Sequence, residues 1–301
     1  MDLVDSAYVD SENELSQVLA FLSESYGMFH SLRNWSLTRM GDWRYGGNSR
    51  FKEVDPDFFS RNLHVWREGA RIVGLAVSER GDVMTLQVSP DRRDLEDRIL
   101  TWIEDQWGRD KDRIVVSAFA HDVWRQNLLK RRGYHITGSR WFLRRYDTML
   151  SPHASPLMDG FSLTDLGHSG DANGTIEVIN KAFGKQSINQ EWFESKRKAP
   201  GFLPSMLVQV LSPGGRCVSC TEARIDWKQN YAEIDPIATH PDYQRMGLAK
   251  ACLAETFRRL AGMKVRDAYI GSDTEAAPSN RVYDAMLPIE KLEEFSWELA
   301  R

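Results

Sequence analysis

A loop between a strand-like run and a helix-like run carries residues suited to bind an anion. The loop is the stretch Gln244-Arg245-Met246-Gly247-Leu248-Ala249. Apolar residues typical of a strand come before it, and apolar residues at helical spacing come after it. A loop that leads into a helix N-terminus presents unpaired backbone N–H groups and the positive end of the helix dipole, a combination that binds phosphate. Gly247 lets the backbone approach an anion closely, and Arg245 adds a mobile positive charge. The pattern predicts a phosphate-binding loop; the alternative is an ordinary turn, where a glycine before a helix is also common.

The strand expected before this loop, Tyr231–Thr239, carries two carboxylates, Glu233 and Asp235. Pro236 lacks an N–H to donate, so we expect a bent or bulged strand. Alternation would place both carboxylates on one face, where repulsion between neighbouring acids helps one of them take a proton from an ammonium group near neutral pH. Alternatively, the two acids would only bind a cationic substrate.

Composition describes an ordinary globular protein. The 301 residues include 42% hydrophobic and 27% charged residues with a net charge of −4, which gives no electrostatic bias toward nucleic acid. No apolar run approaches the roughly 20 residues needed to cross a bilayer, and the N-terminal stretch is acidic. We therefore expect a cytoplasmic location, with neither nucleic acid nor membrane as partner.

The three cysteines, Cys217, Cys220 and Cys252, are odd in number and too few for a disulfide framework. Cys217 and Cys220 have a spacing that metal and redox sites use, but the chain has no second such pair. Because they lie in an apparent strand, alternation would place them on opposite faces. We expect buried thiols and no metal site.

One order of elements occurs twice: strand, helices, β-meander, helix, strand, helix, strand. In the first copy we expect Leu3–Val9, Ser11–Ser23, Leu63–Arg67, Arg71–Ser78, Asp82–Ser89, Leu95–Trp107, Arg113–Phe119, Asp122–Arg132 and Arg140–Tyr146. In the second we expect Phe161–Leu166, Asp171–Phe183, Gln190–Lys198, Met206–Leu211, Arg216–Asp226, Tyr231–Thr239, Leu248–Leu260, Val265–Gly271, Pro278–Met286 and Ile289–Leu299. A duplicated domain is the economical explanation. The expected division is a first domain at 1–147, a linker at 148–160 and a second domain at 161–301.

The second half resembles the GCN5-related N-acetyltransferase (GNAT) superfamily, and the whole chain resembles its tandem, two-domain members. Gln244–Ala249 fits that family's Q/R-x-x-G-x-G/A loop, after Thr239-His240-Pro241-Asp242-Tyr243, and Asn280-Arg281-Val282-Tyr283 falls where the family carries N…Y. The resemblance implies an α/β (α+β) fold of two GNAT-like domains, each a mixed, mainly antiparallel central sheet flanked by helices.

The implied chemistry is acetyl transfer from acetyl-CoA to a primary amine of a small molecule, by direct attack in a ternary complex. The end of the bent strand would pair with the pantetheine arm, and the loop would hold the pyrophosphate. The residues assigned to acetyl-CoA by the resemblance are Ile237, Ala238, Thr239, Gln244, Arg245, Met246, Gly247, Leu248, Ala249, Lys250 and Asn280.

Tyr283 is the implied general acid, because a phenol can protonate a departing thiolate. Its alternative reading is a tyrosine packed between helix and sheet. Glu233 and Asp235 remain competing candidates for the base. Glu233 is favoured, since the histone-acetylating branch of the family has a strand glutamate at the same distance before the loop glutamine.

The sequence departs from the family pattern in two places. Met286-Leu287-Pro288 stands where the family usually has Gly-Phe, which leaves the register of the last strands open. In the first half the stretch that corresponds to the loop is Asp91–Asp97, which has no glycine and has acids at the helix start that would repel pyrophosphate. Gly133-Tyr134 keeps the Gly-aromatic position, so we expect the first half to retain the fold without the cofactor.

Two other functions stay open at this stage. One is a non-catalytic acyl-CoA-binding sensor module. The other is an acyltransferase step in small-molecule biosynthesis with a thiol or amino-sugar acceptor. Either a monomer or a homodimer is compatible with the sequence.

Overall fold

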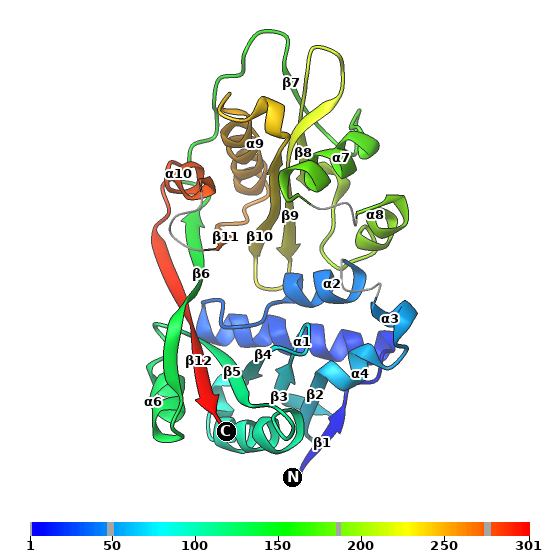
Figure 1. Cartoon of the computed structure of the whole chain (residues 1–301). Coiled ribbons are helices and arrows are strands. Elements are labelled where there is room, and N and C mark those ends of the chain that lie inside the picture. Colours follow the sequence, from blue (N-terminus) through cyan, green and yellow to red (C-terminus); the bar gives the residue numbers. More distant parts are fainter. Residues whose placement is uncertain (1, 47–50, 185–187, 274–277) are drawn as a thin grey trace. The chain divides into compact units, whose positions relative to one another are not determined.

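The computed structural model describes residues 2–46, 51–184, 188–273 and 278–301, and the chain divides into two compact units (Figure 1). Unit 1 contains residues 2–44, 51–141 and 292–301, and unit 2 contains residues 45–46 and the described part of residues 142–291. The expected division, with a first domain at 1–147 and a linker at 148–160, departs from this in two places, because residues 142–160 already belong to unit 2 and the C-terminal end does not. Residues 292–301 follow unit 2 in the sequence but belong to unit 1, because their strand pairs there.

Unit 1 is built on a mainly antiparallel sheet in the order β1-β2-β3-β4-β5-β12. Its strands are β1 (Leu3–Ala7), β2 (Leu63–Glu68), β3 (Arg71–Val77), β4 (Val83–Val88), β5 (Arg113–Phe119) and β12 (Glu290–Ala300). Its helices are α1 (Glu12–Phe29), α2 (Leu37–Tyr45), α3 (Phe51–Val54), α4 (Phe58–Asn62), η1 (Pro90–Arg92), α5 (Leu95–Trp102), the π-helical turn η2 (Ile103–Trp107) and α6 (Val123–Arg131). Strands β4 and β5 are parallel.

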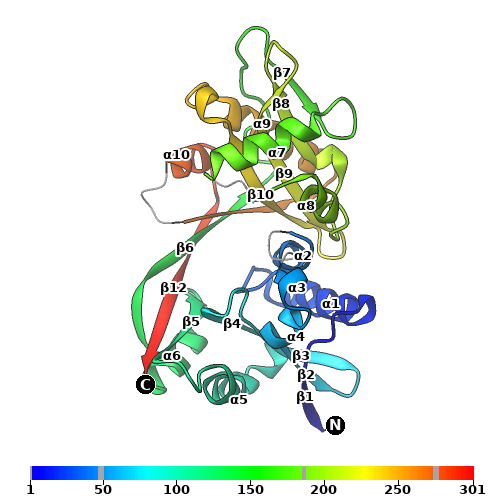
Figure 2. The same cartoon turned by 45° about the vertical axis from the view of Figure 1, so that its right-hand side comes forward.

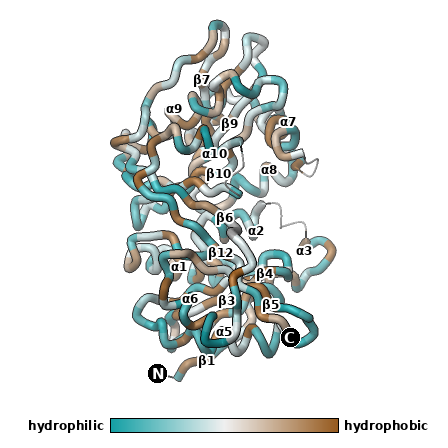
Figure 3. Tube along the Cα trace, turned by 60° about the vertical axis from the view of Figure 1, so that its left-hand side comes forward, coloured by the Kyte–Doolittle hydropathy of each residue, from teal (hydrophilic) through white to brown (hydrophobic). Residues whose placement is uncertain are grey.

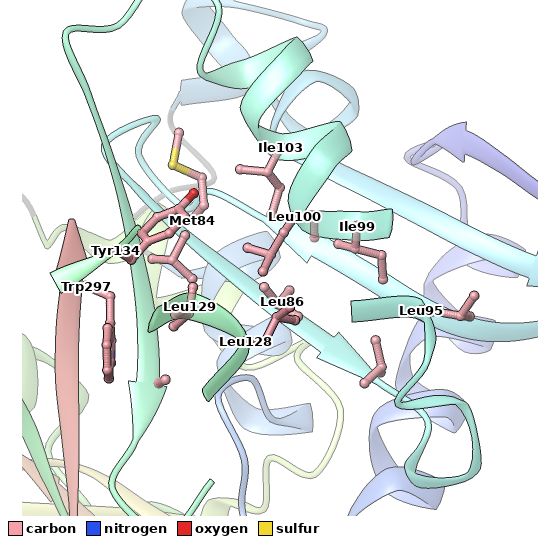
Figure 4. Packing of buried hydrophobic residues seen from close by; sticks show 14 of the residues in the cluster. Met84, Leu86, Leu95, Ile99, Leu100, Ile103, Leu128, Leu129, Tyr134 and Trp297 are labelled. Atoms are coloured by element: carbon pink, nitrogen blue, oxygen red, sulfur yellow. The ribbon is translucent and has the colours of Figure 1, made fainter. Parts of the chain in front are cut away.

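The core of unit 1 lies between this sheet and the helices α5 and α6. Figure 4 shows Ile99 and Leu100 of α5, Leu129 of α6 and Trp297 of β12 among the buried side chains of this cluster. Trp297 lies opposite Val116 in the β5–β12 register and is 1% exposed. The last strand of the chain therefore completes the core of the first unit.

Unit 2 repeats this plan with the sheet order β6-β11-β10-β9-β8-β7. Its strands are β6 (His135–Asp147), β7 (Ser162–Asp165), β8 (Leu207–Leu211), β9 (Cys217–Asp226), β10 (Tyr231–Thr239) and β11 (Asp267–Ser272). Its helices are α7 (Ala172–Ala182), α8 (Gln190–Lys196), η3 (Pro204–Met206), η4 (Pro241–Tyr243), α9 (Leu248–Gly262) and α10 (Ser279–Asp284). Residues 142–147 of β6 belong to this unit, and β10 and β11 are its parallel pair.

Helices α7 and α9 cover opposite faces of the unit 2 sheet (Figure 2). On one face Ala223 and Ile234 pack with Phe257 of α9, and on the other Cys220 packs with Val178 of α7. Each face is buried because strand side chains alternate while a helix presents one apolar stripe.

The expected fold class is confirmed: each unit is a mixed, mainly antiparallel sheet flanked by helices, and the order of elements repeats. Ser11 caps α1 as its sequence position predicts, by accepting a hydrogen bond from the Glu14 N–H. Pro236 lies where the register of β10 against β9 shifts between Ile234 and Ile237, which confirms the bulged strand.

The expectation that Cys217 and Cys220 lie on opposite faces is wrong. Both are buried in one cluster with α7. The register of β8 against β9 shifts between Val210 and Leu211, so Val218 is an extra residue that breaks the alternation. Buried free thiols are confirmed for all three cysteines.

Along the helices, hydrophobic and hydrophilic residues follow one another in short stretches (Figure 3), as in helices with one buried face. Over the part of the chain that the structure describes, no helix has both the length and the apolar character needed to cross a membrane.

Candidate active site

Strands β10 and β11 stop pairing halfway along β10. Their parallel register runs from Tyr231 opposite Asp267 to Glu233 opposite Tyr269, and no further pair occurs between described residues. The bulge after Ile234 follows directly, and β10 continues against β9 up to Thr239. Beyond Glu233, the side of β10 toward β11 therefore has no strand partner among the described residues, and an extended ligand that pairs with a backbone suits such an edge.

The loop after η4 has the backbone of an anion cradle. Arg245 and Gly247 both adopt left-handed conformations, with φ of 64° and 79°. Successive N–H groups around such residues converge to form a concave nest for an anion. Helix α9 then begins at Leu248 with no side-chain cap at Gly247, so its first N–H groups point into the loop without an internal acceptor. A Cβ at Gly247 would meet nothing within 4 Å, which leaves room for a ligand.

The corresponding place in unit 1 has a different backbone. Residues 244–247 separate η4 from α9, whereas only residues 93 and 94 separate η1 from α5. Arg93 and Asp94 are right-handed, with φ of −57° each, so the chain runs as one continuous helical path into α5. The side chain of Glu96, in the first turn of α5, is fully buried and accepts hydrogen bonds from Arg125 at 2.9 and 3.2 Å. Internal ion pairs thus occupy the helix entrance that the loop leaves open in unit 2.

Tyr283 lies on α10 and is 8% exposed. The pKa of Tyr283 is raised to about 12, first by burial and then by the carboxylate of Asp235, while a hydrogen bond with Ser279 and the charge of Arg144 act in the opposite direction. The structure therefore brings Tyr283 and Asp235 within electrostatic range of each other. The Tyr146 hydroxyl donates to the carbonyl of Tyr283 at 3.0 Å and fixes the helix on the sheet.

The two carboxylates of β10 differ in burial and in their place relative to the bulge. Glu233 is partly buried and lies before the bulge, opposite Arg224 in β9. Asp235 is exposed and lies within the bulge. The two acids therefore differ in burial and in position relative to the bulge, and the shared face expected from the sequence stays a prediction.

A buried ion cluster lies beside the bulge and has no motif in the sequence. Glu222 is the β9 residue opposite the bulge, and its carboxylate contacts Lys196 Nζ at 3.2 Å and Arg224 Nε at 2.8 Å. All three side chains are 5% exposed or less. The signal for it in the sequence is a charged pair, Glu222 and Arg224, at alternate positions within the expected strand.

The remaining predicted cofactor residues lie at the end of β10, on α10, in the loop and in the first turn of α9. Ile237 and Ala238 form the end of β10 with Thr239, whose hydroxyl contacts the Ser219 hydroxyl at 2.8 Å. Asn280 is 5% exposed on α10. The loop and first helical turn contribute exposed Gln244 and Lys250 together with Met246, Leu248 and Ala249.

An acyl-CoA pyrophosphate fits this loop, because the uncapped helix start, the two left-handed residues and the exposed cations Arg245 and Lys250 supply donors and positive charge together. Among the residues with described placement, no group of three His, Cys, Asp or Glu side chains could hold a metal ion.

Residues 178–287 match the model of the acetyltransferase (GNAT) family. A GCN5-related N-acetyltransferase from Sphaerobacter thermophilus has 14% identity and a TM-score of 0.63, over 99% of this chain and 95% of that one. A tandem GNAT protein from the clavulanic acid biosynthesis pathway, solved without AcCoA, has 13% identity and a TM-score of 0.66, over 99% and 98%. A GNAT-family acetyltransferase from Colwellia psychrerythraea has 11% identity and a TM-score of 0.59, over 99% and 100%.

No curated protein matches the chain at the level of sequence. The domain of unit 2 belongs to the GNAT superfamily, as its motifs indicated. The whole chain shares the two-domain fold of a tandem GNAT protein.

Proposed function

We propose that unit 2 transfers an acetyl group from acetyl-CoA to a primary amine of a small molecule, by direct attack within a ternary complex. The observation that carries this proposal is the uncapped start of α9 behind a loop with two left-handed residues, at the end of a bulged strand. Family membership supports acyl transfer in general.

The loop and strand would bind and orient the donor. Backbone N–H groups of residues 245–249 bind the pyrophosphate, Arg245 and Lys250 add charge, and Asn280 contacts the pantetheine. Backbone groups of Ile237–Thr239 pair with the pantetheine arm, and an N–H of this strand end stabilises the negative charge that develops on the carbonyl oxygen. Acetyl-CoA supplies an activated acyl group with a thiolate leaving group.

Two groups would move protons. Tyr283 gives its phenolic proton to the leaving sulfur, and Glu233 or Asp235 takes a proton from the acceptor ammonium so that a neutral amine can attack. The proposed acceptor is a small cationic amine, and neither nucleic acid nor a membrane is a proposed partner. The protein is proposed to act in the cytoplasm as a monomer or a homodimer. The described segment between η1 and α5 in unit 1 is right-handed and forms no equivalent cradle, so the proposal includes one acetyl-CoA per chain.

The experiment combines binding and turnover. Isothermal titration of the whole chain with acetyl-CoA is expected to give one site, and free-thiol release is measured over lysine, spermidine, kanamycin, glucosamine and a lysine-containing peptide. Gly247→Ala strains a left-handed position and hinders the phosphate, so acetyl-CoA affinity should fall about tenfold. The matched change Gly215→Ala strains an equally left-handed position in the β8–β9 turn, with φ of 77° and nothing within 4 Å of the added methyl, and should leave affinity unchanged. Two sites of comparable affinity would contradict the proposal for unit 1.

A second candidate function is an acyl-CoA-binding module without turnover. The observation in its favour is the burial of Tyr283, which raises the pKa of the phenol to about 12 and makes it a weak acid. This alternative holds if acetyl-CoA binds, no amine in the panel releases thiol, and Tyr283→Phe changes nothing.

A further inference from the structure

Arg144 of β6 is a fully buried arginine that lies against Tyr283. Its side chain is 0% exposed, and its guanidinium carbon is 5.8 Å from the centroid of the Tyr283 ring. Nε donates to Asp284 Oδ1 at 2.7 Å, and Nη1 donates to the Ser272 hydroxyl at 2.8 Å. These contacts fix the guanidinium beside the ring from two sides.

The remaining guanidinium nitrogen, Nη2, is buried and has no hydrogen-bond acceptor among the described residues. A buried charged donor without an acceptor costs free energy. A guanidinium that is held in this state beside a reacting group therefore calls for an explanation. Such a donor becomes favourable when negative charge develops nearby, because the surroundings need not reorganise. The position of Arg144 therefore suits an anion that forms only during the reaction.

Tyr283 needs such help as a proton donor. Its pKa of about 12 is well above that of an ordinary thiol, about 8.5. A phenol that is a weaker acid than the thiol gives up its proton unfavourably unless the resulting phenolate is stabilised. Asp235 opposes this, whereas Ser279 and Arg144 act in favour of it.

We propose that Arg144 is a positioning residue that holds a positive charge beside Tyr283 and stabilises the phenolate formed when Tyr283 donates its proton. This inference rests on the proposed function. As the amine nitrogen bonds to the acetyl carbon, the C–S bond breaks and its electron pair stays on sulfur. The Tyr283 proton moves to that sulfur, and the phenolate regains a proton from solvent after the amine has released one.

Strand β6 supports this role from one face. Arg144 and Tyr146 are two residues apart, so their side chains leave the strand on the same side. Tyr146 holds the backbone of Tyr283 while Arg144 lies against its ring. The strand thus fixes both the place and the electrostatic environment of the phenol.

The test is a double-mutant cycle with Arg144→Gln and Tyr283→Phe, using acetyl-CoA and the panel amine with the highest kcat/KM. Arg144→Gln is expected to lower kcat about 10- to 50-fold and to change KM for acetyl-CoA less than about threefold, within the range of general-acid effects. In the Tyr283→Phe background it should lower kcat less than about twofold. Arg144→Lys, which keeps the charge, should recover at least about half of the lost kcat on a logarithmic scale.

Rates are taken per folded chain, with the folded fraction measured by circular dichroism. Arg125 in unit 1 supplies the matched control, since it is 2% exposed and pairs with the Glu96 carboxylate at 2.9 Å. Arg125→Gln should lower stability but leave kcat per folded chain within about twofold. An equal loss from Arg144→Gln in both backgrounds shows a merely structural role and overturns this inference alone. A wild-type chain that binds acetyl-CoA but acetylates no amine overturns the proposed function and this inference with it.

Discussion

At the scale of single residues, Leu287 stands in a backbone conformation that suits glycine. It follows α10 with φ of 61°, in the place that Gly133 takes after α6 with φ of 87°. Its side chain is 60% exposed, so little packing offsets the strain. We predict that Leu287→Gly stabilises the chain by about 0.5–1 kcal/mol, the relief of left-handed strain less the entropy of glycine. Urea unfolding measures the difference.

The matched control is the reverse change in unit 1. The nearest atom to a Cβ at Gly133 is a methyl of Leu299 at 3.6 Å, an ordinary contact, so Gly133→Ala adds conformational strain and no clash. It should cost about 1 kcal/mol. A Leu287→Gly chain that is less stable than wild type would show that the leucine side chain packs favourably despite its exposure.

The two carboxylates of β10 are expected to behave differently. Glu233 is partly buried before the bulge, and Asp235 is exposed within it, where its charge opposes ionisation of Tyr283. We predict that Glu233→Gln lowers kcat/KM about 100-fold through loss of the base, whereas Asp235→Asn costs less than about tenfold. The pH dependence of kcat/KM checks this, since loss of the base removes the acidic limb. Wild-type rates for both variants across pH would exclude both as the base.

At the scale of elements, the start of α6 depends on a buried carboxylate. Asp122 is 3% exposed, caps the helix through the Arg125 N–H at 3.2 Å, and pairs with Arg93 at 2.5 Å. Burial alone would raise the pKa of Asp122, but the charges of Arg125, Arg93 and Arg33 outweigh it and lower the pKa to about 2. The carboxylate therefore stabilises the folded chain when it is ionised.

The sign follows from the lowered pKa. Unfolded Asp122 titrates near 3.8 and folded Asp122 near 2, so its stabilisation is complete above pH 3.8 and is lost as pH falls through 2. The shift corresponds to about 2 kcal/mol. We predict that Asp122→Asn, which can still cap the helix, is less stable than wild type by about that amount at pH 6, and that the gap narrows toward pH 3. Urea unfolding at successive pH values measures it; a gap that stays constant would exclude the ion pairs as its origin.

The element that sequence predicted best is the strand and loop that lead into α9. Bounds of β10 were predictable because Tyr231–Thr239 ends at turn residues, and the bulge followed from Pro236. The left-handed conformation of Arg245 was not predictable, because arginine has no preference for positive φ. Arg144 was missed since one arginine within a strand carries no spacing that marks a site.

At the scale of the whole molecule, the repeated order of elements could be predicted, but the partner of the last strand could not. Alternation in Glu290–Ala300 defines a buried face and says nothing of which sheet the strand joins. Sequence neighbourhood favoured the second domain, since sequential strands are usually adjacent. Instead residues 294–300 pair with β5, and Trp297 enters the unit 1 core. A long-range pairing of this kind is decided by packing, which local patterns do not contain.

Because the last strand belongs to unit 1, we predict that a substitution near the C-terminus destabilises unit 1, which is remote from it in sequence. Trp297→Ala removes a side chain that is 1% exposed from the unit 1 cluster, and Phe257→Ala removes a fully buried one from the unit 2 cluster. Each should cost about 3–5 kcal/mol. Trp297→Ala should accelerate hydrogen exchange at the amides of β5 and leave exchange at the amides of α9 unchanged, with acetyl-CoA affinity within twofold of wild type. Phe257→Ala should accelerate exchange at α9, leave exchange at β5 unchanged and lower acetyl-CoA affinity. Equal acceleration of α9 and β5 amides in the Trp297 variant would show that the last strand supports both units, and that the division of the core between them is not an energetic one.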